Sequence, residues 1–119
     1  MEVIKNLDSR KERFMRDSEP VRMGGLAANL ARIKSFSEND DNAVVVYHLL
    51  EESKFYIEWA GLEMETSKAS DIVELQRRIS IWQLRFDEVW KDKTRRRMLA
   101  RFSAHWSSVV LKNSGLLEK

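Results

Sequence analysis

The densest group of side chains able to bind a charged ligand is a basic run between residues 91 and 101. Its six bases are Lys91, Lys93, Arg95, Arg96, Arg97 and Arg101. The planar fork of an arginine matches the oxygens of a phosphate, so these residues are candidate polyanion-binding residues. Bases at the start of a helix oppose its dipole, which predicts a compensating partner. That partner is a polyanion, another subunit, or a carboxylate of this chain among Glu51, Glu58, Glu63 and Glu65.

The two histidines offer weaker chemistry. His48 precedes Glu51 and Glu52 by three and four residues, so one helical face would present a two-ligand metal patch. His105 precedes Ser108 by three residues, but no acid stands nearby to orient it for nucleophilic catalysis. We expect both histidines to be solvated or at the edge of the core. The sequence therefore predicts no catalytic residue, no metal site and no cofactor.

Composition indicates one soluble helical domain. The chain has 119 residues, with 43% hydrophobic and 34% charged residues, one proline and four glycines. It has no cysteine, which excludes thiol catalysis and disulfides and is compatible with the cytoplasm. The longest purely apolar run, Ala43–Tyr47, is far shorter than a membrane span. We therefore expect a cytoplasmic protein with no membrane partner.

Charge is segregated along the chain, although the net charge is only +2. Residues 20–37 carry +3, residues 38–66 carry −7 and residues 91–119 carry +6. This pattern predicts that an acidic helix lies beside a basic one, within the monomer or across a dimer. The alternatives are a polyanion-binding basic face and two faces that are simply solvated.

Apolar residues recur at intervals of three and four in four segments, which is the spacing of one face of an α-helix. The clearest stripe consists of Ile72, Leu75, Ile79, Trp82, Phe86 and Val89. The other three consist of Met23, Leu26, Leu30 and Ile33, then Val46, Leu50, Ser53, Ile57, Ala60 and Met64, then Leu99, Phe102, Trp106 and Val109. Stripes this bulky must be covered by neighbouring helices.

The expected helices cover residues 9–17, residues 20–36, residues 41–65, residues 71–91 and a segment from about residue 94 to Gly115. Residues 37–42 and 66–70 are the expected linkers, with Ser70 as an N-cap. A turn at residues 92–94, capped by Asp92 or Thr94, separates the last two helices; one long bent helix is the alternative. The fold class is all-α, an up-and-down antiparallel four-helix bundle with a short N-terminal helical arm. Residues 1–119 form a single domain, with the arm in 1–19 and the bundle in 20–116.

Two local features need an explanation. Gly24 and Gly25 lie near the start of a helix, which indicates either close approach of a neighbouring helix or a late helix start near Leu26. The arm has a weak apolar face, and Phe14 is its expected anchor.

The four tryptophans all fall on or beside the apolar stripes, so core packing is their default role. Trp59 lies slightly off the main stripe of its helix, close to Tyr56, Glu52 and Glu63. Tryptophan and tyrosine are favoured anchors of protein interfaces. We therefore treat Tyr56, Trp59, Glu52 and Glu63 as a candidate interface.

Two resemblances accompany these patterns. The segment Glu51–Trp59, with Val73–Gln76 and the following Trp82–Gln83, resembles a small uncharacterised all-helical family found in cyanobacteria. This resemblance implies a helical fold and no known activity. The segment Ala27–Ala31, followed by an acidic linker, is similar to the four-helix-bundle proteins encoded in ribosomal RNA intervening sequences. Some relatives of those proteins assist nucleic-acid processing.

These observations together predict a non-enzymatic protein–protein interaction or scaffold protein. We expect it to self-associate as a homo-oligomer, or to bind another protein. The alternative is a nucleic-acid-binding accessory helical bundle that uses the basic segment 91–101. An enzyme is the third possibility.

Overall fold

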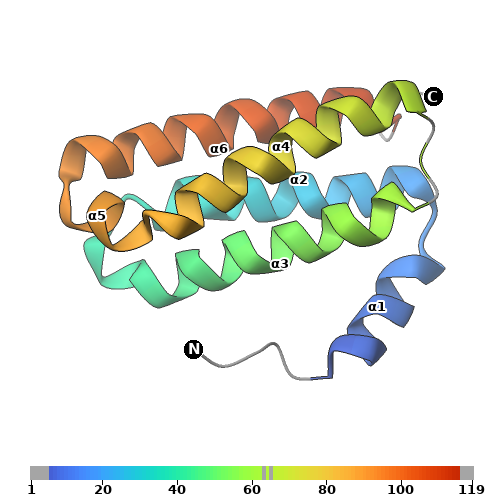
Figure 1. The fold of residues 1–119 in the computed structure, drawn as a ribbon, viewed down its shortest axis with the longest axis horizontal. Coiled ribbons are helices and arrows are strands. Elements are labelled where there is room, and N and C mark those ends of the chain that lie inside the picture. The colour runs from blue at the N-terminus through green and yellow to red at the C-terminus, as the bar shows by residue number, and fades with distance from the viewer. Residues whose placement is uncertain (1–5, 63, 65, 116–119) are drawn as a thin grey trace.

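Helices dominate the computed structural model (Figure 1). It describes residues 6–62, 64 and 66–115, except for the side chains of residues 66–68. The helices are α1 (Leu7–Arg16), α2 (Glu19–Phe36), the 3-10 helix η1 (Asp40–Asn42), α3 (Ala43–Gly61), α4 (Thr66–Leu84), α5 (Phe86–Lys91) and α6 (Lys93–Asn113). No strand occurs among the described residues, so the predicted all-α class is confirmed.

The four long helices, α2, α3, α4 and α6, run side by side along the long axis (Figure 1). α2 packs against both α3 and α6, and α3 packs against α4. The short helices η1 and α5 lie at the same end of the molecule, where α2 connects to α3 and α4 connects to α6. α1 lies to one side, against α3. Within the described residues, no helix has the length and apolarity needed to cross a membrane.

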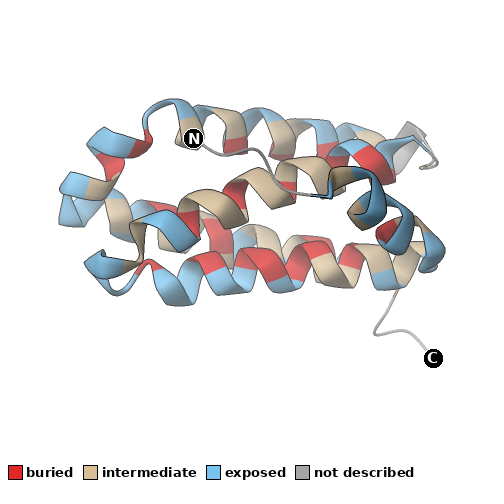
Figure 2. Cartoon of the chain, turned by 90° about the horizontal axis from the view of Figure 1, so that it is seen from below, coloured by how far each residue is buried: buried red, intermediate tan, exposed pale blue. Residues whose placement is uncertain are grey.

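The core follows the predicted stripes of the first three long helices (Figure 2). The buried members of these stripes are Met23, Leu26, Leu30, Ile33, Val46, Leu50, Ser53, Ile57, Ala60, Ile72, Leu75 and Ile79. A helix must turn its apolar side inward because water disfavours exposed apolar surface, and the spacing of three and four therefore identifies that side.

The stripe predicted for the last helix is wrong in phase. Leu99, Ser103 and Val110 are buried, whereas Phe102, Trp106 and Val109 are only half-buried. The reason is a close approach between α2 and α6, where the Ser107 hydroxyl donates a hydrogen bond of 2.7 Å to the Ala27 carbonyl. The two residues at this contact, Ala27 and Ser107, are small, and the bulky Phe102 and Trp106 are only half-buried.

Two predicted boundaries of the third long helix are also wrong. Residues 66–70 belong to α4, so they are not a linker and Ser70 is not an N-cap. This segment has no glycine or proline to stop a helix, and α3 ends earlier than predicted, at Gly61. The predicted helix 71–91 is interrupted at Arg85, which lets Phe86 turn inward. The Phe86 ring then meets the Tyr47 ring edge-on, with centroids 5.2 Å apart.

The turn before α6 agrees with the prediction. Asp92 is the N-cap, and its Oδ1 accepts hydrogen bonds from the backbone N–H groups of Thr94 (2.9 Å) and Arg95 (3.4 Å). The alternative of one long bent helix is therefore wrong. Gly115 follows the end of α6 with φ 81°, as expected for a glycine that terminates a helix.

Of the two explanations offered for Gly24 and Gly25, the late helix start is wrong, and close approach of a neighbouring helix is excluded at Gly25. The helix starts at Glu19, with Pro20 in its first turn, so there is no late start. A Cβ atom added at Gly25 would meet nothing within 4 Å, so no neighbouring helix approaches there. The close approach to α6 occurs at Ala27 instead.

Candidate interaction surfaces

The candidate interface around Trp59 is covered by the chain's own arm. Phe14 is buried, as predicted, and its ring lies 4.4 Å from the ring of Tyr56 and 5.7 Å from that of Trp59. Trp59 is only 5% exposed. Trp59 therefore belongs to the core, which was the default role predicted for the tryptophans, and it is not an open anchor. The physical reason is that Phe14, the one buried residue of α1, is covered by the aromatic side of α3.

Glu52 also serves an internal contact. Its carboxylate forms an ion pair with Arg10 of α1 and accepts a hydrogen bond of 2.9 Å from Nδ2 of Asn29 in α2. Arg22 of α2 fixes the other end of the arm, because its Nε donates to the carbonyl of Asp17 at 2.7 Å. Glu63, the fourth residue of the candidate interface, lies outside the described residues.

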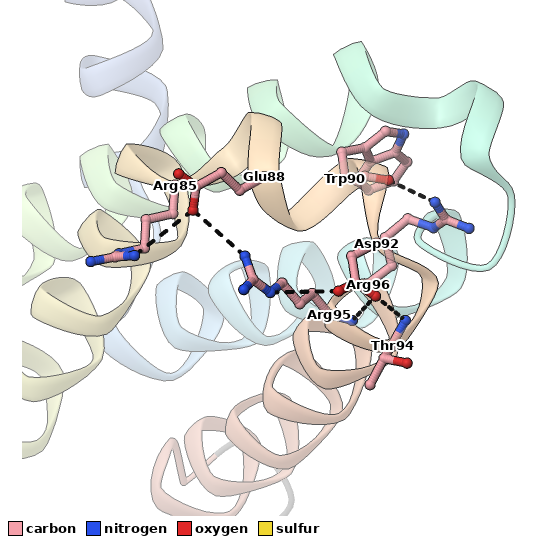
Figure 3. Close-up of polar contacts among 7 residues, drawn as sticks. All are labelled: Arg85, Glu88, Trp90, Asp92, Thr94, Arg95 and Arg96. Carbon is pink, nitrogen blue, oxygen red and sulfur yellow. Dashed lines mark hydrogen bonds and ion pairs between the residues drawn. The ribbon is translucent and has the colours of Figure 1, made fainter.

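Two bases of the segment 91–101, Arg95 and Arg96, contact groups of α5 and of the turn before α6 (Figure 3). Arg95 approaches two carboxylates, at 3.5 Å from Glu88 and 3.6 Å from Asp92. Arg96 donates a hydrogen bond of 2.6 Å to the carbonyl of Trp90, and its guanidinium lies over the Trp90 ring, 5.7 Å from the centroid. These two arginines therefore hold α5 against the start of α6.

The carboxylates that compensate these bases are not the predicted ones. Glu88 and Asp92 lie just before α6, whereas no ion pair among the described side chains joins the basic segment to Glu51 or Glu58 of α3. Glu63 and Glu65 are outside the described residues. The signal that sequence analysis missed is proximity along the chain, since the sharp turn at Asp92 folds α5 back toward Arg95.

The remaining bases of the segment face solvent. Lys91, Lys93, Arg97 and Arg101 are exposed. Within the described part of the chain, none of the four takes part in an ion pair. The structure thus brings Arg95 and Arg96 together with local partners and leaves the other four cations on the surface.

The acidic and basic helices are not neighbours in the monomer. α2 packs between α3, which belongs to the acidic part of the sequence, and α6, which belongs to the basic part (Figure 1). The prediction that these helices lie side by side within the monomer is therefore wrong. Their pairing across a dimer stays a prediction.

The histidines lie apart from one another. His48 is half-buried, and its ring stands edge-on to that of Tyr47, with centroids 6.5 Å apart. His105 is exposed, and the hydroxyl of the nearby Ser107 donates to the Ala27 carbonyl. No group of three His, Cys, Asp or Glu side chains in the described chain is placed to hold a metal ion.

A second surface, which sequence analysis missed, is apolar. Leu84, the last residue of α4, is 85% exposed, and Val44 in the first turn of α3 is 68% exposed. Both lie at a groove of about 360 Å³, whose lining comprises Ala43, Val44, Tyr47, Gln83, Leu84, Phe86 and Asp87. Val73 and Ile81 of α4 are exposed as well. We refer to Val44, Val73, Ile81, Leu84 and the groove as the Leu84 surface.

The spacing of its residues could have revealed the Leu84 surface. Val73, Arg77, Ile81 and Leu84 recur at intervals of four, four and three, which places them on one face of α4. That face lies opposite the buried residues Ile72, Leu75 and Ile79.

The resemblances noted in the sequence stay predictions. No family model matches the chain, and no curated protein or solved structure is significantly similar to it. An assignment of function therefore rests on the surfaces described above.

Proposed function

We propose that this protein is a non-enzymatic interaction or scaffold protein that self-associates through the Leu84 surface. In this proposal α2, α3, α4 and α6 constitute an up-and-down four-helix bundle, α1 is its arm, and α5 is part of the turn between α4 and α6. The absence of cysteine fits a protein of the cytoplasm.

The observation that carries the proposal is the exposure of Leu84 beside an apolar groove. Exposed leucines are common, but this one lines a groove together with Tyr47, Phe86 and the exposed Val44. The exposed Ile81 lies one helical turn before it on α4. Contiguous exposed apolar surface of this kind marks interaction sites in soluble proteins. A two-fold axis close to Leu84 would insert the leucine of each copy into the groove of the other, which is the self-complementary arrangement of a cyclic dimer.

Charge on the same side of the molecule supports a second copy as the partner. Glu51 and Glu58 follow Val44 at intervals of seven residues, so the three share a face of α3. Arg77 lies between Val73 and Ile81 on the exposed face of α4. Arg77 is held by Glu74 of its own helix. A two-fold axis that brings α3 of one copy toward α4 of the other would therefore place the acids of α3 opposite a group of net positive charge, Arg77 and Arg78 around Glu74.

Analytical ultracentrifugation across the micromolar range tests the proposal with two matched variants. Leu84→Lys introduces a charge into the proposed interface, at a helix end where a base suits the dipole. Met98→Lys makes the same change at a 54% exposed methionine of α6, a helix that contributes no residue to the lining of the groove. Because burying a leucine is worth roughly 1.5–3 kcal/mol and a dimer buries two, Leu84→Lys should weaken dimerisation by about 100-fold or more.

The expected result is a dimer for the wild type and for Met98→Lys, and a monomer for Leu84→Lys with unchanged circular dichroism. A wild-type protein that sediments as a monomer at every concentration would refute the proposal. Equal dimerisation of all three proteins would refute the assigned surface.

A further inference from the structure

We propose that the outward face of α6 binds the phosphate backbone of a nucleic-acid duplex without reading its bases. This inference goes beyond self-association and does not depend on it, because different residues on a different helix carry it. The binding face, here called the α6 ridge, consists of Arg97, Arg101, His105, Ser108 and Lys112.

The α6 ridge is a straight row of exposed residues. Its members follow one another at intervals of four, four, three and four, so they share one face of the helix. All five are exposed, and the opposite face of α6 carries the buried Leu99, Ser103 and Val110. At 1.5 Å per residue, the ridge from Arg97 to Lys112 is about 22 Å long. It therefore presents cations over a length that spans several consecutive phosphates.

The surroundings of the ridge leave its charge uncompensated. Residues 93–113 contain six bases and no acid. The adjoining α2 has no acid after Glu19 in its first turn. Glu19 and Asp71 of α4 line a pocket beside Trp106 and Asn113, near the end of α6. The nearest acids before α6, Glu88 and Asp92, are already engaged by Arg95. In the described structure, Arg97, Arg101 and Lys112 form no ion pair.

The ridge suits a polyphosphate better than a membrane or a protein. A helix that binds a membrane surface exposes a broad apolar face, whereas the apolar face of α6 is turned into the core. A protein interface needs a buried apolar or aromatic centre, and Met98 is the one exposed large apolar residue of α6 among those described. Arginines offer forks that match phosphate oxygens, and His105 and Ser108 add hydrogen-bonding groups between the charges.

Base recognition is not available on this face. The aromatic residues of α6, Phe102 and Trp106, are half-buried and contact each other, with ring centroids 6.4 Å apart. Neither belongs to the exposed row that would face the ligand. Without exposed rings to stack on bases, single strands have no advantage over duplexes, and binding should be independent of sequence.

Fluorescence anisotropy with a labelled DNA duplex of mixed sequence tests this inference. A duplex of RNA and a single DNA strand serve as further probes. The test variant is Arg97→Gln/Arg101→Gln/Lys112→Gln, which removes three ridge charges at solvent-facing positions. The matched control is Arg77→Gln/Arg78→Gln/Arg85→Gln, which removes the same charge from α4 and its end, where Glu74 and Glu88 engage the arginines. Circular dichroism verifies that both variants fold.

For three phosphate contacts the wild-type affinity should fall about 40-fold between about 50 mM and about 200 mM salt, because log K changes with log salt by about −0.9 per contact. The test variant should lose most of this affinity and its salt dependence, whereas the control should change less than about threefold. Duplexes of DNA and RNA should bind similarly, and at least as tightly as the single strand. Absence of binding by the wild type at low salt, or equal losses in the two variants, would overturn the inference. So would a clear preference for the single strand.

Discussion

The ring of Phe14 stacks on the ring of Tyr56, with the two centroids 4.4 Å apart and the planes inclined by 17°. This contact joins α1 to α3 and closes the arm over Trp59. The ion pair between Arg10 and Glu52 supports it at the rim. The aromatic surface formed by Tyr56 and Trp59 is therefore covered by α1 of the same chain.

Replacing Phe14 with alanine should release the arm and leave the long helices folded. Truncating a core phenylalanine to alanine costs roughly 3–5 kcal/mol, so the open arm should become about 100-fold more populated or more. Limited trypsin digestion measures this population, because Arg13 and Arg16 lie in α1. Met15→Ala, which truncates a half-buried neighbour, is the control. Equal cleavage rates for Phe14→Ala and the wild type would show that the ring does not hold the arm.

Acid titration should reveal the ion pairs on α4. Hydrogen bonds from Arg77 and Arg78 lower the pKa of Glu74 from its ordinary value of 4.5 to about 2. A carboxyl with a lowered pKa in the folded state contributes stability above its ordinary value, and that contribution disappears as the pH falls from 4.5 through about 2. The effect on stability should be small, because these side chains are solvated.

Carboxyl-carbon NMR measures this titration directly. The midpoint of Glu74 should lie near 2 in the wild type. It should return toward 4.5 in Arg77→Gln/Arg78→Gln, which lacks both donors. An ordinary midpoint in the wild type would contradict the bidentate geometry on α4.

Removing the N-cap of α6 should destabilise the turn that separates α5 from α6. Asp92→Ala deletes the acceptor for two backbone N–H groups, and the loss of an N-cap costs about 1 kcal/mol. Asp92→Asn keeps an acceptor oxygen and should remain close to the wild type. Urea unfolding followed by circular dichroism compares the two. The prediction fails if both variants unfold at the wild-type midpoint.

Replacing glycine with alanine should increase the stability of the folded protein at one position and decrease it at another. Gly25 lies in the interior of α2, where an added methyl group would have nothing within 4 Å, so Gly25→Ala should stabilise the protein by about 0.4–1 kcal/mol. Gly115 has φ 81°, which strains any residue with a Cβ, so Gly115→Ala should destabilise it by roughly 1 kcal/mol. Thermal unfolding measures both, and a shift of the same sign would contradict this account.

Helical periodicity predicts the core because a helix that packs on one side buries residues three and four positions apart. Leu26, Leu50 and Leu75 are fully buried at positions that the stripes identified. The cap at Asp92 and the terminating Gly115 were equally predictable, since each depends on the chemistry of a single residue in a local conformation. The interruption at Arg85 was not, because no glycine or proline marks it.

Contacts between distant segments were beyond the reach of sequence patterns. The covering of Trp59 by Phe14 depends on how the arm folds back across the side of α3. Sequence analysis identified these residues as candidates because of their chemical types, but their partners follow from the three-dimensional arrangement.

The position of α2 between α3 and α6 keeps the acids of α3 apart from the bases of α6, so charge is unevenly distributed even though the net charge is only +2. On the proposal that the α6 ridge binds nucleic acid, the field of the polyanion turns the protein before contact, so that α6 faces the polymer and α3 faces away from it. At physiological ionic strength this electrostatic interaction extends only about 8 Å into the solvent, so it orients the protein only at short distances from the polymer.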